Sequence, residues 1–224
     1  MPRIDFHCHT KYSKCSNLEP KDILKLCRKL ELHGIMICDH NTIKGTLAFK
    51  EILSPNEDFI FVPGVEILTD RGEIIGAWIE DNLKTSHFPE VAEEIEEKGG
   101  LVVIPHPFDI IRGKRFRVTE ADLPFIDAIE VFNSRCILPK ANKKALQIAE
   151  KYSVIQTAGS DAHFTPEIGR AWINFTGSSM DEFRKSLEKG ETTTYGQRSP
   201  FSLHLHTLKH RLSRTFKRNR KYEI

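Results

Sequence analysis

The sequence predicts an α/β fold, built as a barrel within a single domain, and three observations lead to it. Short apolar runs alternate with helical patterns from the first residues to about residue 190, which is typical of β-α units and a parallel sheet. Histidines and carboxylates stand at or just after the ends of several runs, and in a β/α barrel these strand ends share one face. A chain of 224 residues is also long enough for one well-buried domain.

The first half of the chain is expected to contain buried strands and a helix. The strands are predicted over residues 3–9, 35–38 and 59–62, with a hairpin or edge strand at 72–79. The helix is predicted over 20–32, where apolar residues recur at helical spacing. Pro20 suits its first turn and Gly34 its C-terminal end.

The second half repeats the alternation. Helices are expected over 88–98, 140–152 and 180–188, and strands over 101–104, 126–132, 154–158 and 171–175. Residues 109–118 contain four basic side chains and no apolar period, which indicates a basic loop. We therefore divide the chain into a barrel over 1–195 and an extension over 196–224.

The extension is basic. The net charge of the chain is +2, yet residues 209–221 hold seven Lys or Arg and no acid, so the rest of the chain is acidic. Such a tail could contact the phosphates of a nucleic acid, although terminal charge runs are more often solvated.

The composition indicates the cellular compartment of the protein. Five cysteines, with no C-x-x-C pair, argue against a disulfide framework and for a reducing environment. No apolar run approaches the roughly 18 residues that cross a bilayer, so a soluble cytoplasmic protein is expected, without a membrane partner. There is neither a G-x-S-x-G step nor a Walker-type phosphate loop. The oligomeric state is not determined by the sequence.

The first strand carries the strongest chemical signal. Because side chains alternate in a strand, Asp5, His7 and His9 share one face. Two imidazoles on one face can chelate a metal, while the carboxylate one step deeper orients a ring through its second nitrogen. The alternative is a hydrogen-bonded polar patch in the core.

Six segments, in order, resemble the motifs of the polymerase and histidinol phosphatase (PHP) domain family. They are Asp5-Phe-His-Cys-His-Thr10, Cys38-Asp-His-Asn-Thr42, Pro63-Gly-Val-Glu66, Ile104-Pro-His-Pro-Phe108, Ile129-Glu-Val-Phe-Asn133 and Gly159-Ser-Asp-Ala-His163. The resemblance implies a distorted seven-unit, TIM-like β/α barrel. It also implies two or three Zn, Mn or Fe ions and the cleavage of phosphate esters.

The resemblance also implies a ligand set. A first metal would be held by His7, His9, Glu66 and Asp161. Glu66 would bridge to a second metal that His106 also binds, while His40 and His163 match the residues that hold a third.

The chain departs from the family pattern beside the third position. Ser13-Lys14-Cys15 stands where the family has Ser-Asp-Gly, and an ammonium repels a cation. We therefore favour two metals, with Lys14 replacing the third ion and binding substrate phosphate. The alternative is that Lys14 points away and Cys15 is a soft ligand. Asn41 also replaces a common aspartate, and a further ligand of the second metal is not placed.

A metal-activated water would be the nucleophile. His163, His40 and Lys14 are candidates to give the leaving group a proton or a positive charge. Arg135 and Arg170 are expected to contact phosphate oxygens, whereas the basic loop around Arg112 is as well explained by solvation. Glu130 is either bonded to backbone or placed behind a ligand.

The predicted substrate is a small phosphomonoester, a nucleotide or an oligonucleotide. Two other functions stay open: an amidohydrolase-type metallohydrolase, which also begins with His-x-His, and a catalytically weak barrel that binds nucleic acid through residues 209–221. The first usually needs a bridging lysine, and Glu66 occupies that place. The second would account for Lys14 and Asn41.

Overall fold

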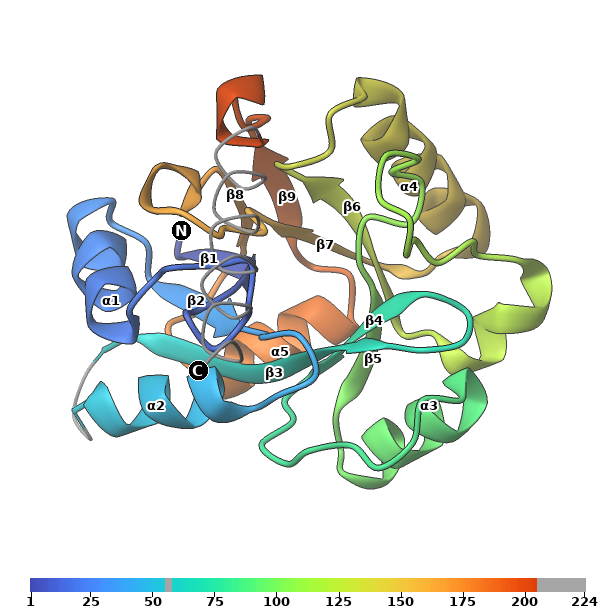
Figure 1. Ribbon diagram of the computed structural model, residues 1–224, viewed down its shortest axis with the longest axis horizontal. Helices are drawn as coiled ribbons and strands as arrows, with labels where there is room; N and C mark the ends of the chain where they lie inside the picture. The colour runs from blue at the N-terminus through green and yellow to red at the C-terminus, as the bar shows by residue number, and fades with distance from the viewer. Residues whose placement is uncertain (55–57, 205–224) are drawn as a thin grey trace, which may run out of the picture.

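A nine-stranded sheet curls into a nearly closed barrel in the computed structural model, of which residues 1–54 and 58–204 are described here (Figure 1). The strands are β1 (Arg3–Cys8), β2 (Gly34–Ile37), β3 (Ile60–Leu68), β4 (Glu73–Ala77), β5 (Leu101–Ile104), β6 (Ala128–Asn133), β7 (Ile155–Gly159), β8 (Ala171–Asn174) and β9 (Thr193–Gly196). The order in the sheet is β7-β6-β5-β4-β3-β2-β1-β8-β9. The predicted α/β fold with a distorted barrel in a single domain is confirmed.

The distortion comes from strands that run against the barrel direction. β4 is antiparallel to both β3 and β5, and the predicted hairpin at 72–79 is therefore confirmed. β8 and β9 are antiparallel additions beside β1. The segment after β7 reaches the edge of β1 that β2 does not occupy, beyond the short pairing with β8, and there the amide of Asp161 donates to the carbonyl of His7 at 2.7 Å. This contact between the segment after β7 and β1 nearly closes the barrel.

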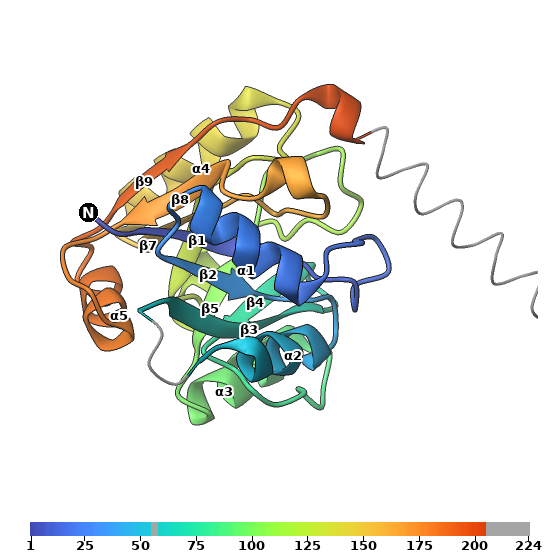
Figure 2. The ribbon, with the colours of Figure 1, turned by 90° about the vertical axis from the view of Figure 1, so that its left-hand side faces the viewer.

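Helices cover the outer face and one end of the barrel (Figure 2). They are α1 (Pro20–Lys29), α2 (Lys44–Ile52), α3 (Phe88–Glu97), α4 (Pro139–Tyr152) and α5 (Met180–Glu188). The sequence did not predict α2. It also placed the end of α1 three residues too late, because Glu31 takes a left-handed conformation (φ 53°) that ends the helix in spite of the apolar Leu30 and Leu32.

The core has three buried clusters. One fills the barrel and its lower end, where Phe6 packs between Trp78 and Phe183 of α5. The second lies between the sheet and helices α3 and α4, and the third lies under α1 and α2. Because α5 and these apolar side chains fill the end where the strands begin, the opposite end is left for polar residues.

The segment after β9 returns to the top of the barrel. The amide of Ser199 donates to the carbonyl of Ser134 at 2.7 Å. The predicted boundary between residues 195 and 196 stays a prediction, and the basic segment 209–221 lies outside the described residues. Within the described part, no helix is long and apolar enough to cross a membrane.

Candidate metal centre

His7 of β1 and His9, which directly follows this strand, begin the site. His7 and His9 are fully buried, and their Nε2 atoms face each other at 3.1 Å. β1 is continuous with the sheet on both sides, so these rings are held by main-chain pairing rather than by a loop. Two ring nitrogens at this separation suit a shared cation better than a bond to each other.

Two carboxylates converge on the same nitrogens. Oε2 of Glu66, from β3, lies 3.5 Å from Nε2 of His9, and Oδ1 of Asp161, which follows β7, lies 3.2 Å from the same atom. Nε2 of His106, just after β5, is 3.3 Å from Oε1 of Glu66. Glu66 thus has one oxygen toward His9 and the other toward His106, as a bridging carboxylate requires.

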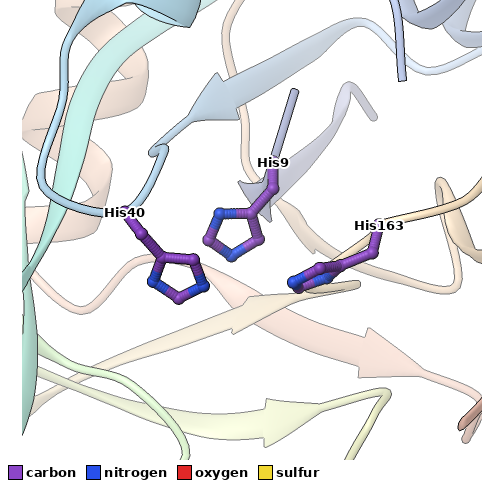
Figure 3. A group of neighbouring side chains, drawn as sticks. All are labelled: His9, His40 and His163. Carbon is purple, nitrogen blue, oxygen red and sulfur yellow. The ribbon is translucent and has the colours of Figure 1, made fainter. Parts of the chain in front are cut away.

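His40 and His163 flank His9 (Figure 3). The ring centroid of His9 lies 4.5 Å from that of each neighbour. Nδ1 of His163 is 2.8 Å from the carbonyl oxygen of Asp161, so this nitrogen carries the proton and leaves Nε2 with a lone pair. Nδ1 of His40 is 2.8 Å from Oε2 of Glu66.

All seven residues predicted to bind metal therefore lie in one buried cluster. Their ligand atoms form groups with every atom within 4.8 Å of the others: His7 with His9 and Glu66, His7 with His106 and Asp161, and His9 with His40 and His163. Whether each binds an ion stays a prediction, but the structure brings them together from five strand ends.

The donor set fits divalent ions. Oε2 of Glu66 and Oδ1 of Asp161 are buried, make no well-aligned hydrogen bond to the described residues, and face imidazole nitrogens: Nδ1 of His40 at 2.8 Å and Nε2 of His9 at 3.2 Å. Nδ1 of His106 is also buried without a hydrogen-bond partner among these residues. Buried carboxylate oxygens that face ring nitrogens without a well-aligned hydrogen bond are costly, and a cation between them would satisfy both partners. Imidazole nitrogen and carboxylate oxygen are ligands for Zn, Mn and Fe.

The pKa shifts of Glu66, Asp161 and His9 agree with this fit. Burial raises the pKa of Glu66 and Asp161, but nearby cations outweigh it. His40 helps to hold the pKa of Glu66 well below its ordinary value, and Arg112 does so for Asp161. Burial lowers the pKa of His9 to about 4. The cluster therefore offers ionised carboxylates and a neutral His9, the forms that bind metals. Burial lowers the pKa of His7, but neighbouring anionic groups outweigh it and raise this pKa well above its ordinary value, so a metal would displace a proton from His7.

Glu130 orients two of the ligands. Its Oε1 lies 3.0 Å from Nδ1 of His7, and its Oε2 accepts from the amide of His106 at 2.9 Å. Both interpretations of this residue thus hold, because it bonds backbone and also sits behind a ligand. The expectation that Asp5 orients a ring is wrong. Asp5 accepts instead from the amides of Ser160 (2.8 Å) and Gly169 (2.9 Å), tying the loop after β7 to β1.

Hydrogen bonds hold the start of the segment between β2 and β3 in place. Asp39 accepts from the amide of Thr10 at 2.8 Å and from Oγ of Ser13 at 2.5 Å. Asn41 is left-handed (φ 52°), and its Oδ1 accepts from the amide of Leu68. Asparagine tolerates this backbone conformation, so Asn41 holds β3 in place where the family commonly has an aspartate.

Lys14 and Cys15 lie in the loop after β1, near His40. The side chain of Lys14 is exposed on its loop, whereas Cys15 is half-buried and interacts with His40. Burial lowers the pKa of His40, but Glu66 and Cys15 raise it well above its ordinary value. Cys15 thus lies beside the third position, and the replacement of the third ion by Lys14 stays a prediction.

The predicted arginines divide into two groups. Arg135 is buried, and its NH1 lies 2.7 Å from Oε1 of Glu167. Arg170 donates from Nε to the carbonyl of Pro166 at 2.9 Å. Both arginines therefore form bonds within the protein, and their contact with substrate phosphate stays a prediction. Arg112, which the sequence left undecided, forms an ion pair with Asp161 inside the cluster.

Glu73 is a site residue that the sequence did not indicate. It begins β4, is buried, and places Oε1 3.9 Å from Nδ1 of His40, so that His40, Glu66 and Glu73 form a further group of possible ligands. Burial and the neighbouring Glu66 raise its pKa. No sequence motif indicates Glu73, because the antiparallel pairing of β4 with β3 brings this residue to the cluster.

Known proteins match this sequence. A family model described as PHP-associated matches residues 139–192. The uncharacterized protein MJ0417 of Methanocaldococcus jannaschii is 37% identical over 187 residues, which cover 80% of this chain and 73% of that protein.

Solved structures agree on the fold. A two-domain protein from Bacteroides vulgatus, described as containing a predicted PHP-like metal-dependent phosphoesterase, matches with a TM-score of 0.71 and 17% identity, over 88% of this chain and 65% of that one. PsfC from Pseudomonas syringae matches with a TM-score of 0.69 and 19% identity, over 95% and 99% of the two chains. With its ordered motifs converging on one cluster, the chain belongs to the PHP domain family.

Proposed function

We propose that the protein is a metal-dependent hydrolase that cleaves a phosphate ester of a small phosphomonoester or nucleotide. The convergence of His7, His9, Glu66, His106 and Asp161 carries this proposal, because imidazole and carboxylate groups of the kind that bind divalent ions meet there in two groups of three, with their ligand atoms within 4.8 Å of one another. Membership of the PHP family and the fold of the B. vulgatus protein support it.

The predicted ligands divide between two principal metal positions. His7, His9, Glu66 and Asp161 would hold one ion, and Glu66 with His106 a second. Divalent ions at such a site activate a water nucleophile and neutralise phosphoryl oxygens. Cys15 beside His40 supports a third metal position. Metal analysis of the active protein measures whether two or three ions are bound.

The protein's own groups would act on the two ends of the reacting bond. His40 lies at the mouth of the cluster with 27% of its side chain exposed, where it can give a proton to the leaving alkoxide. His163 is buried deeper, and its Nδ1 is committed to the carbonyl of Asp161. The guanidinium of Arg112 already contacts a carboxylate of the cluster, so it can contact phosphoryl oxygens at the same place.

The competing functions receive less support. An amidohydrolase-type site needs a bridging lysine, and among the described residues the bridging position is held by Glu66. A non-catalytic barrel would have no reason to gather the buried carboxylates of Glu66 and Asp161 among imidazoles, because burying charged groups costs stability.

A substrate screen tests the proposal. Protein loaded with Mn, Zn or Fe is offered phosphomonoesters, nucleotides, short oligonucleotides and lactones. We expect turnover of a phosphate ester that is lost in Asp161→Asn and kept in Glu97→Gln, an exposed carboxylate on α3. Turnover of lactones alone would indicate the amidohydrolase class, and turnover of none would falsify the enzymatic proposal.

A further inference from the structure

A cavity lies on the loop that follows the cluster residue His106. It has a volume of about 800 Å³ and lies between the loop after β5 and the first half of α4. Figure 1 shows this loop, in green, passing beside α4. We refer to the cavity as the basic pocket, because five of the ten residues that line it are Arg115, Arg117, Lys140, Lys143 and Lys144.

The charge of the basic pocket is not balanced locally. No Asp or Glu lines it, and none of its five cations pairs with a carboxylate among the described residues. Lysines elsewhere in the structure do pair, as Lys11 does with Glu19 (2.8 Å) and Lys98 with Asp81 (3.3 Å). Like charges gathered around a concavity repel one another and raise the local concentration of anions. An anionic ligand is the natural complement.

The wall between the cations is apolar. Phe108, Ile110 and Val118 come from the loop, and Ala141 comes from α4. The side chain of Ile110 is 55% exposed, and Nζ of Lys144 lies 4.5 Å from the ring centroid of Phe108. An aromatic and aliphatic wall suits the flat face of an organic ring rather than a bare ion.

Two connections link the basic pocket to the metal centre. Phe108 comes two residues after His106, and Arg112 of the same loop pairs with Asp161. On the helix side, Asn142 accepts from the amide of Asn133, whose side chain donates to Asp161 at 3.2 Å. A molecule in the pocket would therefore lie against the same loop and helix that support the metal ligands.

We propose that the basic pocket binds a nucleotide-sized organic phosphate, with its ring against the apolar wall and its phosphates on the lysines and arginines. Resting on the proposed function, the pocket holds the part of the substrate remote from the reacting ester. The substrate class is then a phosphate ester that carries a second anionic group. Nothing in the metal chemistry requires this second site, so the two proposals can fail separately.

Binding is tested first, without catalysis. The full-length protein is treated with a chelator, and ADP and inorganic phosphate are titrated by calorimetry at low salt. We expect ADP to bind at least tenfold more tightly than phosphate, because only ADP can use the apolar wall. Absence of ADP binding, or equal binding of the two, overturns the proposal.

A matched pair of triple variants locates the site. Lys140→Gln/Lys143→Gln/Lys144→Gln removes three pocket charges, and Lys21→Gln/Lys25→Gln/Lys29→Gln removes three exposed charges from α1. Glutamine is a good helix former, so both triples should keep the unfolding temperature of the parent. We expect the pocket triple to weaken ADP binding at least tenfold and the α1 triple less than twofold. Equal weakening would mean that only net charge matters, which overturns the assignment.

Kinetics then tests the link to the reaction. On a nucleotide substrate found in the screen, the pocket triple should raise KM at least tenfold and leave kcat within about twofold. On p-nitrophenyl phosphate, which has no second anionic group, both constants should be unchanged. If KM rises equally for both esters, the pocket does not hold the remote part of the substrate.

Discussion

Oε1 of Glu130 lies 3.0 Å from Nδ1 of His7, although 123 residues separate the two along the chain. The bond fixes the ring so that Nε2 faces His9 and the carboxylates, and the other oxygen of Glu130 holds the amide of His106. One buried carboxylate thereby positions a ligand of each proposed metal.

The variant Glu130→Gln tests this positioning role. The amide can still accept from one neighbour, but it no longer holds both His7 and His106 as an ionised acceptor does. We expect metal affinity to fall by about 10-fold to 100-fold, the usual effect of removing such a partner. Competition titration against a chromophoric chelator measures this. Glu150→Gln, an exposed carboxylate on α4, is the control and should bind metal as the parent does.

Arg112 is expected to have opposite effects on metal binding at neutral and at acid pH. Burial raises the pKa of Asp161, and Arg112 contributes most to holding it well below its ordinary value instead. The carboxylate therefore stays ionised as the pH falls. In Arg112→Gln its pKa rises, so a proton competes with the metal from a higher pH downward.

Metal titrations of Arg112→Gln over a pH series measure both effects. At pH 7.5 the variant should bind metal more tightly, because a cation has left the cluster. The midpoint of the acid loss should move up by about one pH unit, which is typical for removing an adjacent opposite charge. Arg117→Gln on the same loop should change neither. An unmoved acid midpoint would contradict the role of Arg112.

The buried pair of Arg135 and Glu167 should matter for folding. Oε2 of Glu167 also accepts from the amides of His163 (2.8 Å) and Phe164 (3.0 Å), so the pair shapes the loop that carries His163. Arg135→Met strands a buried carboxylate, and the free energy of unfolding should fall by about 3 to 5 kcal/mol. Denaturant titration measures it.

The double variant separates this role from substrate binding. In Arg135→Met/Glu167→Gln the stranded charge is gone, so the loss should be smaller than the sum of the two single losses. If Arg135→Met leaves stability untouched and raises KM alone, then Arg135 serves the substrate instead.

Gly159 should tolerate no side chain. A Cβ at this position would collide with Cβ of His7 and lie 2.7 Å from its backbone nitrogen, at the seam where β7 meets β1. Gly159→Ala should cost about 1 to 3 kcal/mol of stability and weaken metal binding by displacing His7. In Gly113→Ala the new Cβ meets nothing within 4 Å, and this variant should be neutral. Thermal unfolding of the two variants, with and without metal, distinguishes packing at the seam from a general effect of alanine.

The sequence by itself determined the kind of site and the elements that carry it. The alternation of His7 and His9 in a strand is a local property with a period of two, and residue type alone gives imidazole and carboxylate their affinity for metals. The strand-end positions of Glu66, His106 and Asp161 needed only the barrel rule that such ends share one face. These inferences depend on short stretches of chain or on a general rule of topology.

Only the tertiary structure decided which neighbours act on those ligands. Glu130 was undecided, Glu73 unsuspected and Asp5 misassigned, because strand register and the antiparallel turn to β4 set their partners. Arg112 reaches Asp161 from a loop with no periodic pattern, 49 residues away. Contacts between segments far apart in sequence follow from packing of the whole barrel, and no local pattern records them.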